Sequence, residues 1–151
     1  MKQMRVYLAS PFFNEEEKSV YREVISYLRE QKIDVFVPME HEVKNAWEIS
    51  NEEWGNRVFA MDFVELKKSD VVLVLNWGMY SDSGTAWECG CAFALGKKVI
   101  NVCVNRNCDE YSLMMINGCN SSILLETMLA YPFKELVEIN GNTTTEYISV
   151  K

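Results

Sequence analysis

Residues 81–98 decide the fold, and they read S-D-S-G-T-A-W-E-C-G-C-A-F-A-L-G-K-K. The polar opening offers Asp82 and Ser83 as helix caps, and Gly96 is placed to end the helix in the C′ position. Within the body of this predicted helix the one charged residue is Glu88. The other positions of the helical wheel are small or apolar, which predicts a buried helix.

Glu88 needs an explanation, because a carboxylate on a buried helix is costly unless it is paired or used. With Ser83 as the N-cap, Glu88 lies in the second turn. There the positive end of the helix favours the ionised form, and burial favours the neutral form. An ionised, poorly solvated carboxylate is a reasonable nucleophile. The alternative is an ordinary helix glutamate that points to water, and the apolar surroundings in the sequence favour the functional interpretation.

The composition limits the number of domains and the classes of binding partner. The chain has 151 residues, with 48% hydrophobic and 25% charged residues, which is ordinary for a single domain over residues 1–151. The net charge of −7 argues against a nucleic acid polymer or an anionic membrane as the main partner. The N-terminus does not resemble a signal peptide, and no segment approaches the ~20 apolar residues of a membrane span. We therefore expect a cytoplasmic protein.

The cysteine and histidine counts limit the kinds of metal site and catalytic site that the chain can form. The five cysteines form no C-x-x-C pair, which indicates small core residues in a reducing compartment rather than a metal or redox site. His41 is the single histidine, which excludes a His-rich zinc site. No Ser or Cys stands in a nucleophile elbow that would use it. Carboxylates are thus the candidates for catalysis.

Alternating strands and helices predict an α/β fold with a parallel sheet covered by helices on both faces. Asn14 is placed to cap the first helix, and a second helix is expected over 51–68. The tail over 136–150 reads as a hairpin with Asn140 and Gly141 at its turn, or as an irregular tail. The expected strands cover residues 4–9, 33–37, 70–75, 98–104 and 121–124.

In such sheets the site lies beyond the carboxyl ends of the strands. This edge gathers Tyr7, Asp82 and Glu88, with loop aromatics around them. Asp62 interrupts the apolar positions of the second helix, and its spacing fits a solvated residue as well as a site residue. Carboxylates that act without histidine or metal indicate glycosyl chemistry, and aromatic rings suit a flat leaving group such as a nucleobase. The loop aromatics are Phe12, Phe13, Trp47 and Trp77.

Several motifs carry a family resemblance: Y-L-A-S-P-F-F at 7–13, V-P at 37–38, F-A-M-D at 59–62, S-D-V-V-L-V at 69–74 and D-S-G-T-A-W-E-C-G-C-A at 82–92. The chain resembles the nucleoside 2-deoxyribosyltransferases up to about Ile123. The resemblance implies a flavodoxin-like, doubly wound sheet of about five strands. It also implies a homo-oligomer, a dimer or higher, with shared active sites and a place in nucleotide salvage.

The resemblance also implies the roles of individual residues. Glu88 would be the nucleophile that forms a covalent 2-deoxyribosyl-enzyme, and Tyr7 would orient it. Asp62 and Asp82 would bind the base and assist its protonation, in a ping-pong exchange between deoxynucleosides and free nucleobases. No cofactor or metal is implied. We expect substrate contacts from Ser10, Phe12, Phe13, Glu42, Trp47, Gly84, Trp77 and Ser112.

Two departures from the family bear on substrate choice. The loop after the second strand reads E-H-E where the family often carries an amide, so base selection passes to Glu40 or Glu42. The segment that the family borrows from a neighbouring subunit reads S-L-M-M, with Ser112 where an asparagine is usual.

Two alternatives stay open. A hydrolase of deoxynucleosides or their 5′-monophosphates would need a phosphate site, for example Ser10 and the helix-end N–H groups near Asn14. No Arg or Lys cluster stands in the expected site loops, which counts against it, although Arg106 keeps it open. A non-catalytic nucleotide-binding module would not require Tyr7 together with the three carboxylates.

Overall fold

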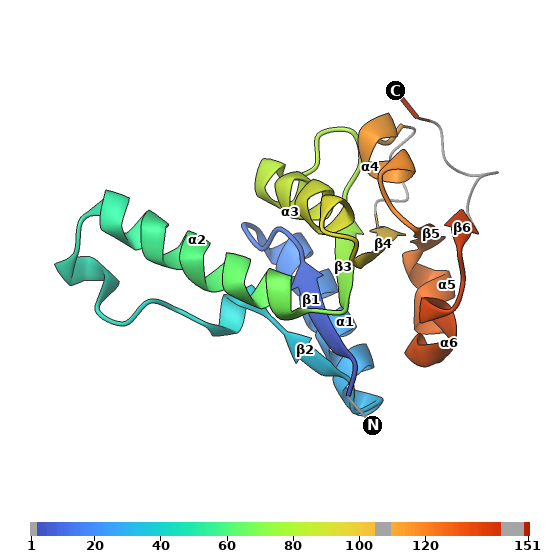
Figure 1. Cartoon of the computed structure of the whole chain (residues 1–151), viewed down its shortest axis with the longest axis horizontal. Helices are drawn as coiled ribbons and strands as arrows, with labels where there is room; N and C mark the ends of the chain where they lie inside the picture. Colours follow the sequence, from blue (N-terminus) through green and yellow to red (C-terminus); the bar gives the residue numbers. More distant parts are fainter. Residues whose placement is uncertain (1–2, 105–109, 143–149) are drawn as a thin grey trace.

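The computed structural model describes residues 3–104, 110–142 and 150–151. Its centre is a six-stranded sheet in the order β2-β1-β3-β4-β5-β6, and every pair of neighbours is parallel (Figure 1). The strands are β1 (Arg5–Ala9), β2 (Asp34–Phe36), β3 (Val71–Asn76), β4 (Lys98–Cys103), β5 (Ser121–Leu124) and β6 (Gly141–Asn142). The helices are α1 (Glu15–Glu30), α2 (Asn51–Lys68), α3 (Ser83–Ala94), α4 (Leu113–Asn117), α5 (Leu125–Leu129) and α6 (Phe133–Val137).

The predicted α/β alternation is confirmed, and the five expected strands form within a few residues of their predicted bounds. The tail differs from the expected hairpin. Its first arm instead includes the end of α6, and β6 pairs in parallel with β5. Gly141 has a φ of 100° and lies in β6 rather than in a two-residue turn. Residues 143–149 lie outside the described residues.

The alternating side chains of the strands separate two apolar layers. Val6 and Leu8 of β1 pack with α1, α5 and α6 on one face of the sheet. Tyr7 and Ala9 face the other side, where they pack with α2, α3 and α4. Because successive residues of a strand point to opposite faces, this register places the Tyr7 ring under α3.

The first helix begins as its sequence predicts. The Asn14 side chain accepts a hydrogen bond from the Glu17 backbone N–H at 2.8 Å. The Glu17 side chain accepts one in return from the Asn14 N–H at 3.3 Å. This capping box satisfies two N–H groups that the helix leaves open. It fixes the start of α1 directly after the β1 loop.

The central helix α3 differs from prediction in its burial. Of the two candidate caps, Asp82 is the N-cap, and Gly96 ends the helix with a φ of 75° as expected. The prediction of a helix buried all round is wrong in the single chain. One face packs on the sheet, whereas Trp87 is 51% exposed and Phe93 is 46% exposed. A helix that is apolar on every side does not reveal from its sequence which side is covered within the single chain.

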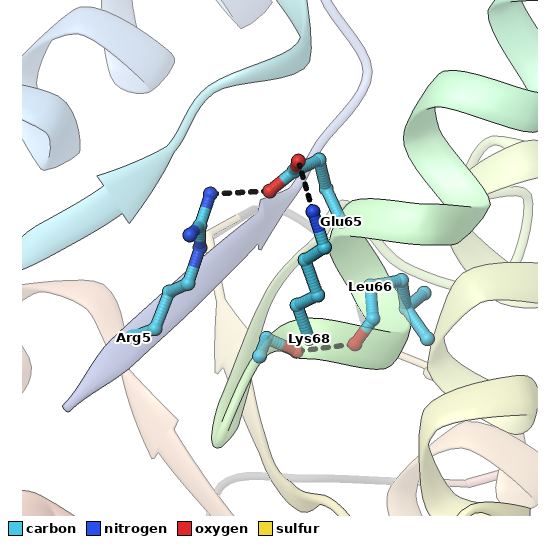
Figure 2. Close-up of polar contacts among 5 residues, drawn as sticks. Arg5, Glu65, Leu66 and Lys68 are labelled. Carbon is cyan, nitrogen blue, oxygen red and sulfur yellow. Dashed lines mark hydrogen bonds and ion pairs between the residues drawn. The ribbon is translucent and has the colours of Figure 1, made fainter. Parts of the chain in front are cut away.

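The long helix α2 is anchored at its C-terminal end. Glu65 pairs with Arg5 of β1 and lies 3.7 Å from the Lys68 ammonium, as Figure 2 shows. The N-terminal turns project away from the sheet, together with the segment that carries the 3₁₀ turns η1 (Pro38–Glu40) and η2 (Ala46–Glu48) (Figure 1). None of the helices in the described ranges is long and apolar enough to span a membrane.

Candidate active site

The site is built around a contact between β1 and α3. Tyr7 is fully buried in β1, and its hydroxyl donates a hydrogen bond to Glu88 Oε2. Glu88 stands in the second turn of α3, on the side that faces Tyr7 and the helix α2. The sheet register and the helix start thus bring together the two residues that the sequence predicted as partners.

These two residues line a cavity of about 490 Å³ between α2 and α3. Asp62 of α2 and Gly84 of α3 line it as well, so four of the predicted site residues share one hollow. The remaining walls are largely apolar side chains of the two helices: Trp54, Val58, Phe59, Phe63, Leu66 and Trp87. Apolar walls strengthen electrostatic interactions among the few polar groups inside.

Burial dominates the charge state of Glu88. The pKa of this carboxyl is raised from 4.5 to about 7, mainly by burial; the Tyr7 hydrogen bond opposes the rise, and the nearby Asp62 and Asp82 charges contribute to it. Burial and the Glu88 charge also raise the pKa of Tyr7 far above its usual range, so the phenol stays neutral and donates. The sequence implies that the helix end lowers the pKa of Glu88 and that burial raises it. In the structure the effect of burial is the larger one.

Asp62 belongs to the site rather than to the solvated face of α2. Burial raises its pKa to about 6, and His41 partly offsets that rise. Its Oδ1 atom is buried and has no hydrogen-bond partner among the described residues. A buried carboxyl oxygen without a partner inside a cavity is available to a bound molecule.

Asp82 makes the helix-capping contact that its position in the sequence allows. Its Oδ2 atom accepts hydrogen bonds from the Thr85 backbone N–H at 2.8 Å and from the Thr85 hydroxyl at 2.9 Å. It therefore caps α3, and its charge acts on Glu88. Asp82 is not among the residues that line the cavity of Glu88.

A second cavity of about 590 Å³ adjoins the first between α1, α2 and the segment before α2. The two cavities share Trp54, Val58 and Asp62. Of the predicted substrate contacts, Phe12, Glu42 and Trp47 line the second cavity.

This cavity is also lined by two cations, Lys18 and Arg22, which together with His41 are called its cationic side. The sequence shows no Lys or Arg cluster in the expected site loops, and the two cations come instead from α1.

The other predicted contacts lie elsewhere in the described structure. Ser10 is buried and its hydroxyl donates to the Pro11 carbonyl at 2.9 Å. Phe13 is exposed and stacks on Phe12. Trp77 packs against the core on the α1 side of the sheet, and Ser112 is the N-cap residue of α4. None of these four is among the residues that line the two cavities.

Two further residues named from the sequence are also accounted for. Glu40 forms an ion pair with Arg29 of α1, which removes it as a base-selecting carboxylate and leaves Glu42. Arg106 lies outside the described residues.

Sequence reasoning missed the aromatic rim of the first cavity. Phe59 lies 5.5 Å from both Phe63 and Trp87, measured between ring centroids, and Trp54 lines the same hollow. Three of these rings, Trp54, Phe59 and Phe63, lie on α2, where the sequence pattern does not distinguish rim positions from core positions. These rings differ from core residues in their exposure, since Phe59 is 53% exposed. The spacing of apolar residues in a sequence does not predict that exposure.

Comparison with known families agrees with this geometry. The profile of the nucleoside 2-deoxyribosyltransferases matches residues 6–124, which include Tyr7, Asp62, Asp82 and Glu88. The chain belongs to this family. Family membership makes the protein an enzyme that acts on nucleosides, as a transferase or as an N-glycosidase. A separate comparison with curated proteins found no match.

Solved structures place the chain beside family relatives. It is similar to a 2-deoxyribosyltransferase from Bacillus psychrosaccharolyticus, with 31% identity over 87% of this chain and 95% of that chain and a TM-score of 0.75. A CMP N-glycosidase from Clostridium botulinum shares the fold at 22% identity over 83% of this chain and 96% of that chain, with a TM-score of 0.58. A conserved protein from Enterococcus faecalis does so at 20% identity over 93% and 90%, with a TM-score of 0.61.

Proposed function

We propose that this family member transfers the 2-deoxyribosyl group from one nucleobase to another through a covalent intermediate on Glu88. The single observation that carries the proposal is the Tyr7 hydrogen bond to Glu88 Oε2 inside a cavity that also holds Asp62. Tyr7 fixes one carboxylate oxygen, so the other oxygen, Oε1, is left to react. Glycosyl transfer needs one ionised carboxylate and one carboxylic acid. Because the pKa of Asp62 is about 6 and that of Glu88 about 7, the form with Glu88 ionised and Asp62 protonated is a minor form of the pair and is most populated between these two values.

In the first half of the reaction, Glu88 Oε1 attacks the anomeric carbon of the deoxynucleoside. The bond from that carbon to the base nitrogen breaks, and its electron pair stays with the base. Asp62, with a pKa of about 6, gives its proton to the departing base. The products are a free neutral base and a deoxyribosyl ester of Glu88.

In the second half the acceptor base enters and its ring nitrogen attacks the anomeric carbon. The ester bond breaks, Glu88 leaves as a carboxylate, and Asp62 takes the proton that the acceptor nitrogen loses. Two displacements at one carbon give retention of configuration. Asp82 assists by holding the start of α3 in place and by its charge near Glu88.

Two features of the substrate and the cavity favour transfer. The 2-deoxy sugar lacks the hydroxyl that would destabilise a positively charged transition state, so a simple carboxylate suffices. The walls around Glu88 are largely aromatic and aliphatic, which limits the attack of water on the ester. In the single chain the rim residues Phe59 and Trp87 are about half exposed. We therefore also propose that a second copy of the chain covers this rim, as the family resemblance implies.

The second candidate is hydrolysis of the N-glycosidic bond, with water in place of the acceptor base. The observation that favours it is the pair of cations Lys18 and Arg22 beside the site, which could hold a 5′-phosphate. The similar structure from Clostridium botulinum is a CMP N-glycosidase, and at 22% identity that likeness shows the fold.

Product analysis separates the two candidates. The protein is incubated with deoxyinosine or thymidine, with and without free adenine, and the products are resolved by chromatography. New deoxyadenosine that forms only with adenine is the result that transfer predicts. Free base and free sugar in equal amounts with or without adenine would identify a hydrolase. The same series with deoxynucleoside 5′-monophosphates tests the phosphate requirement, and Glu88→Ala is the inactive control.

A further inference from the structure

The positive charges around the site are divided unevenly between its two cavities. The first cavity contains Tyr7, Asp62 and Glu88, and no lysine, arginine or histidine is among its described lining residues. The second cavity has three such groups on one side: Lys18 and Arg22 of α1, four positions apart, and His41 of the segment before α2. Residues four apart lie on the same face of a helix, so the two α1 cations act together.

Asp62 fixes the direction in which the substrate must lie. Glu88 lines the first cavity and the cations line the second, whereas Asp62 lines both. The proton donor must reach the base nitrogen while the nucleophile reaches the anomeric carbon on the other side of the same bond. The leaving base therefore extends past Asp62 and into the second cavity.

We propose that the cationic side of the second cavity selects bases that carry a carbonyl oxygen at purine C6 or pyrimidine C4, such as hypoxanthine, guanine, uracil and thymine, over adenine and cytosine, which carry an amino group there. The proposal rests on the glycosyl chemistry assigned to Glu88 above and adds the class of base. It names Arg22, Lys18 and His41 as specificity-determining residues. None of the three was expected to contact the substrate from the sequence.

The donor and acceptor pattern of the cavity supports this choice. Arginine and lysine donate hydrogen bonds to carbonyl oxygens and ring nitrogens, as in their contacts with guanine O6 and N7. The amino group that adenine and cytosine carry in the corresponding place is itself a donor and meets these cations unfavourably. Glu42 lines the same cavity and accepts the ring N–H that stands beside the carbonyl in an oxo base. The cations thus donate to the carbonyl oxygen of an oxo base, and the Glu42 carboxylate accepts from its neighbouring ring N–H.

Lys18 forms an ion pair of 3.5 Å with Glu15 of its own helix, whereas Arg22 has no ion pair among the described residues. The guanidinium groups of Arg29 and Arg57, by contrast, are paired with Glu40 and Glu53 and line neither cavity. The His41 ring stacks on Phe36 with 4.6 Å between centroids and 17° between planes. This stacking holds the imidazole against the end of β2, where its charge also acts on Asp62.

A 5′-phosphate is the competing ligand for the same cations. The phosphate is attached through C5′ and C4′ of the sugar, and not to the leaving group. The position of the phosphate is therefore determined by the sugar in the first cavity, whereas the base itself extends past Asp62 into the second cavity. The order of Glu88, Asp62 and the cations along the site thus favours the base.

Binding to a catalytically inactive protein tests the inference apart from turnover. In a Glu88→Gln background, calorimetry measures the affinities of deoxyinosine, deoxyadenosine and deoxyinosine 5′-monophosphate, with and without Arg22→Gln. We expect deoxyinosine to bind about tenfold more tightly than deoxyadenosine, and Arg22→Gln to remove that difference. Arg57→Gln, an exposed arginine of α2, is the matched control and should change nothing. Circular dichroism checks that each variant is folded.

The outcomes are distinguishable from failure of the proposed function. Equal affinities for the two nucleosides, or a preference that survives Arg22→Gln, would overturn the base assignment while the enzyme chemistry stands. A loss in Arg22→Gln confined to the monophosphate would overturn it in favour of a phosphate site. Absence of nucleoside binding to the inactive protein would contradict the proposed function itself.

Discussion

The hydroxyl of Tyr7 donates a hydrogen bond to Glu88 Oε2, joining two residues that are 81 positions apart in the sequence. The bond crosses from the central sheet to the helix that covers it, so it exists only in the folded chain. It stabilises the ionised carboxylate against the burial that raises its pKa to about 7. It also leaves one carboxylate oxygen for chemistry. The predictions below follow from this arrangement.

Replacing Tyr7 by Phe removes the donor and keeps the ring. The pKa of Glu88 then rises, because the hydrogen bond that lowers it is lost. At neutral pH a smaller fraction of the protein carries the reactive carboxylate, and kcat/KM should fall about 10- to 100-fold. The pH profile checks the cause, since activity should be lost at acidic and neutral pH and should match the wild type at alkaline pH, where Glu88 is ionised in both proteins. A uniform loss of activity at every pH would contradict this role for the hydroxyl.

The pH dependence of kcat/KM should be bell-shaped, with limbs near the pKa values of about 6 for Asp62 and about 7 for Glu88. The proposed mechanism needs Glu88 ionised and Asp62 protonated, a form that is most populated between the two pKa values. The ionised fraction of Glu88 rises with pH, and the protonated fraction of Asp62 falls.

Asp62→Asn tests the assignment of the two limbs. It should abolish the decline at high pH and slow deoxynucleosides with poorly leaving bases most. Asp34→Asn, at an exposed position of β2, is the matched control that should leave the profile unchanged. A wild-type profile in Asp62→Asn would refute its role as the acid.

Glu88→Gln should make the fold more stable at alkaline pH. Burial raises the Glu88 pKa from 4.5 to about 7, so between these values the folded protein binds the proton more tightly than the unfolded chain. Stability from this group is therefore present at low pH and is lost as the pH rises through 7. The variant removes the buried charge and should gain about 1–3 kcal/mol at pH 8, with little gain near pH 4.5. Urea unfolding at both pH values measures the difference.

Glu65→Gln should loosen the anchored end of α2. Glu65 pairs with Arg5 of β1, and its side chain is 17% exposed while that of Arg5 is 36% exposed (Figure 2). Loss of a partly buried pair should lower the free energy of unfolding by about 1 kcal/mol. The more exposed pair of Arg57 and Glu53 gives the control, because Glu53→Gln should cost less. Equal losses in the two variants would show that the anchor adds nothing beyond a surface pair.

The sequence predicted the parts of the fold that local patterns determine. The capping pattern at Asn14, the apolar run of β3 and the glycine at 96 are written in short stretches, and each forms as expected. The C-terminal tail failed as a prediction because Asn140 and Gly141 fit a hairpin turn locally. Packing of α6 on the sheet and pairing with β5 decide their structure instead. A two-residue turn signal is weak against such tertiary contacts.

The candidate site was predictable where chemistry sets the residue type. A lone carboxylate on an apolar helix led to Glu88, and the family resemblance led to Tyr7 and Asp62. The cations of the second cavity were not found, because Lys18 and Arg22 look like any exposed helix positions until the segment before α2 lies across from them. The same holds for the aromatic rim, since Phe59 and Trp87 meet only when α2 and α3 pack.

The covalent intermediate is the central claim, and mass spectrometry tests it most directly. The protein is mixed with a deoxynucleoside without an acceptor base, quenched in acid, and measured intact and after digestion. We predict a mass increase of one deoxyribosyl group, carried by the peptide that contains Glu88 and absent from Glu88→Gln. A label on another residue, or turnover without any label under these conditions, would contradict the account.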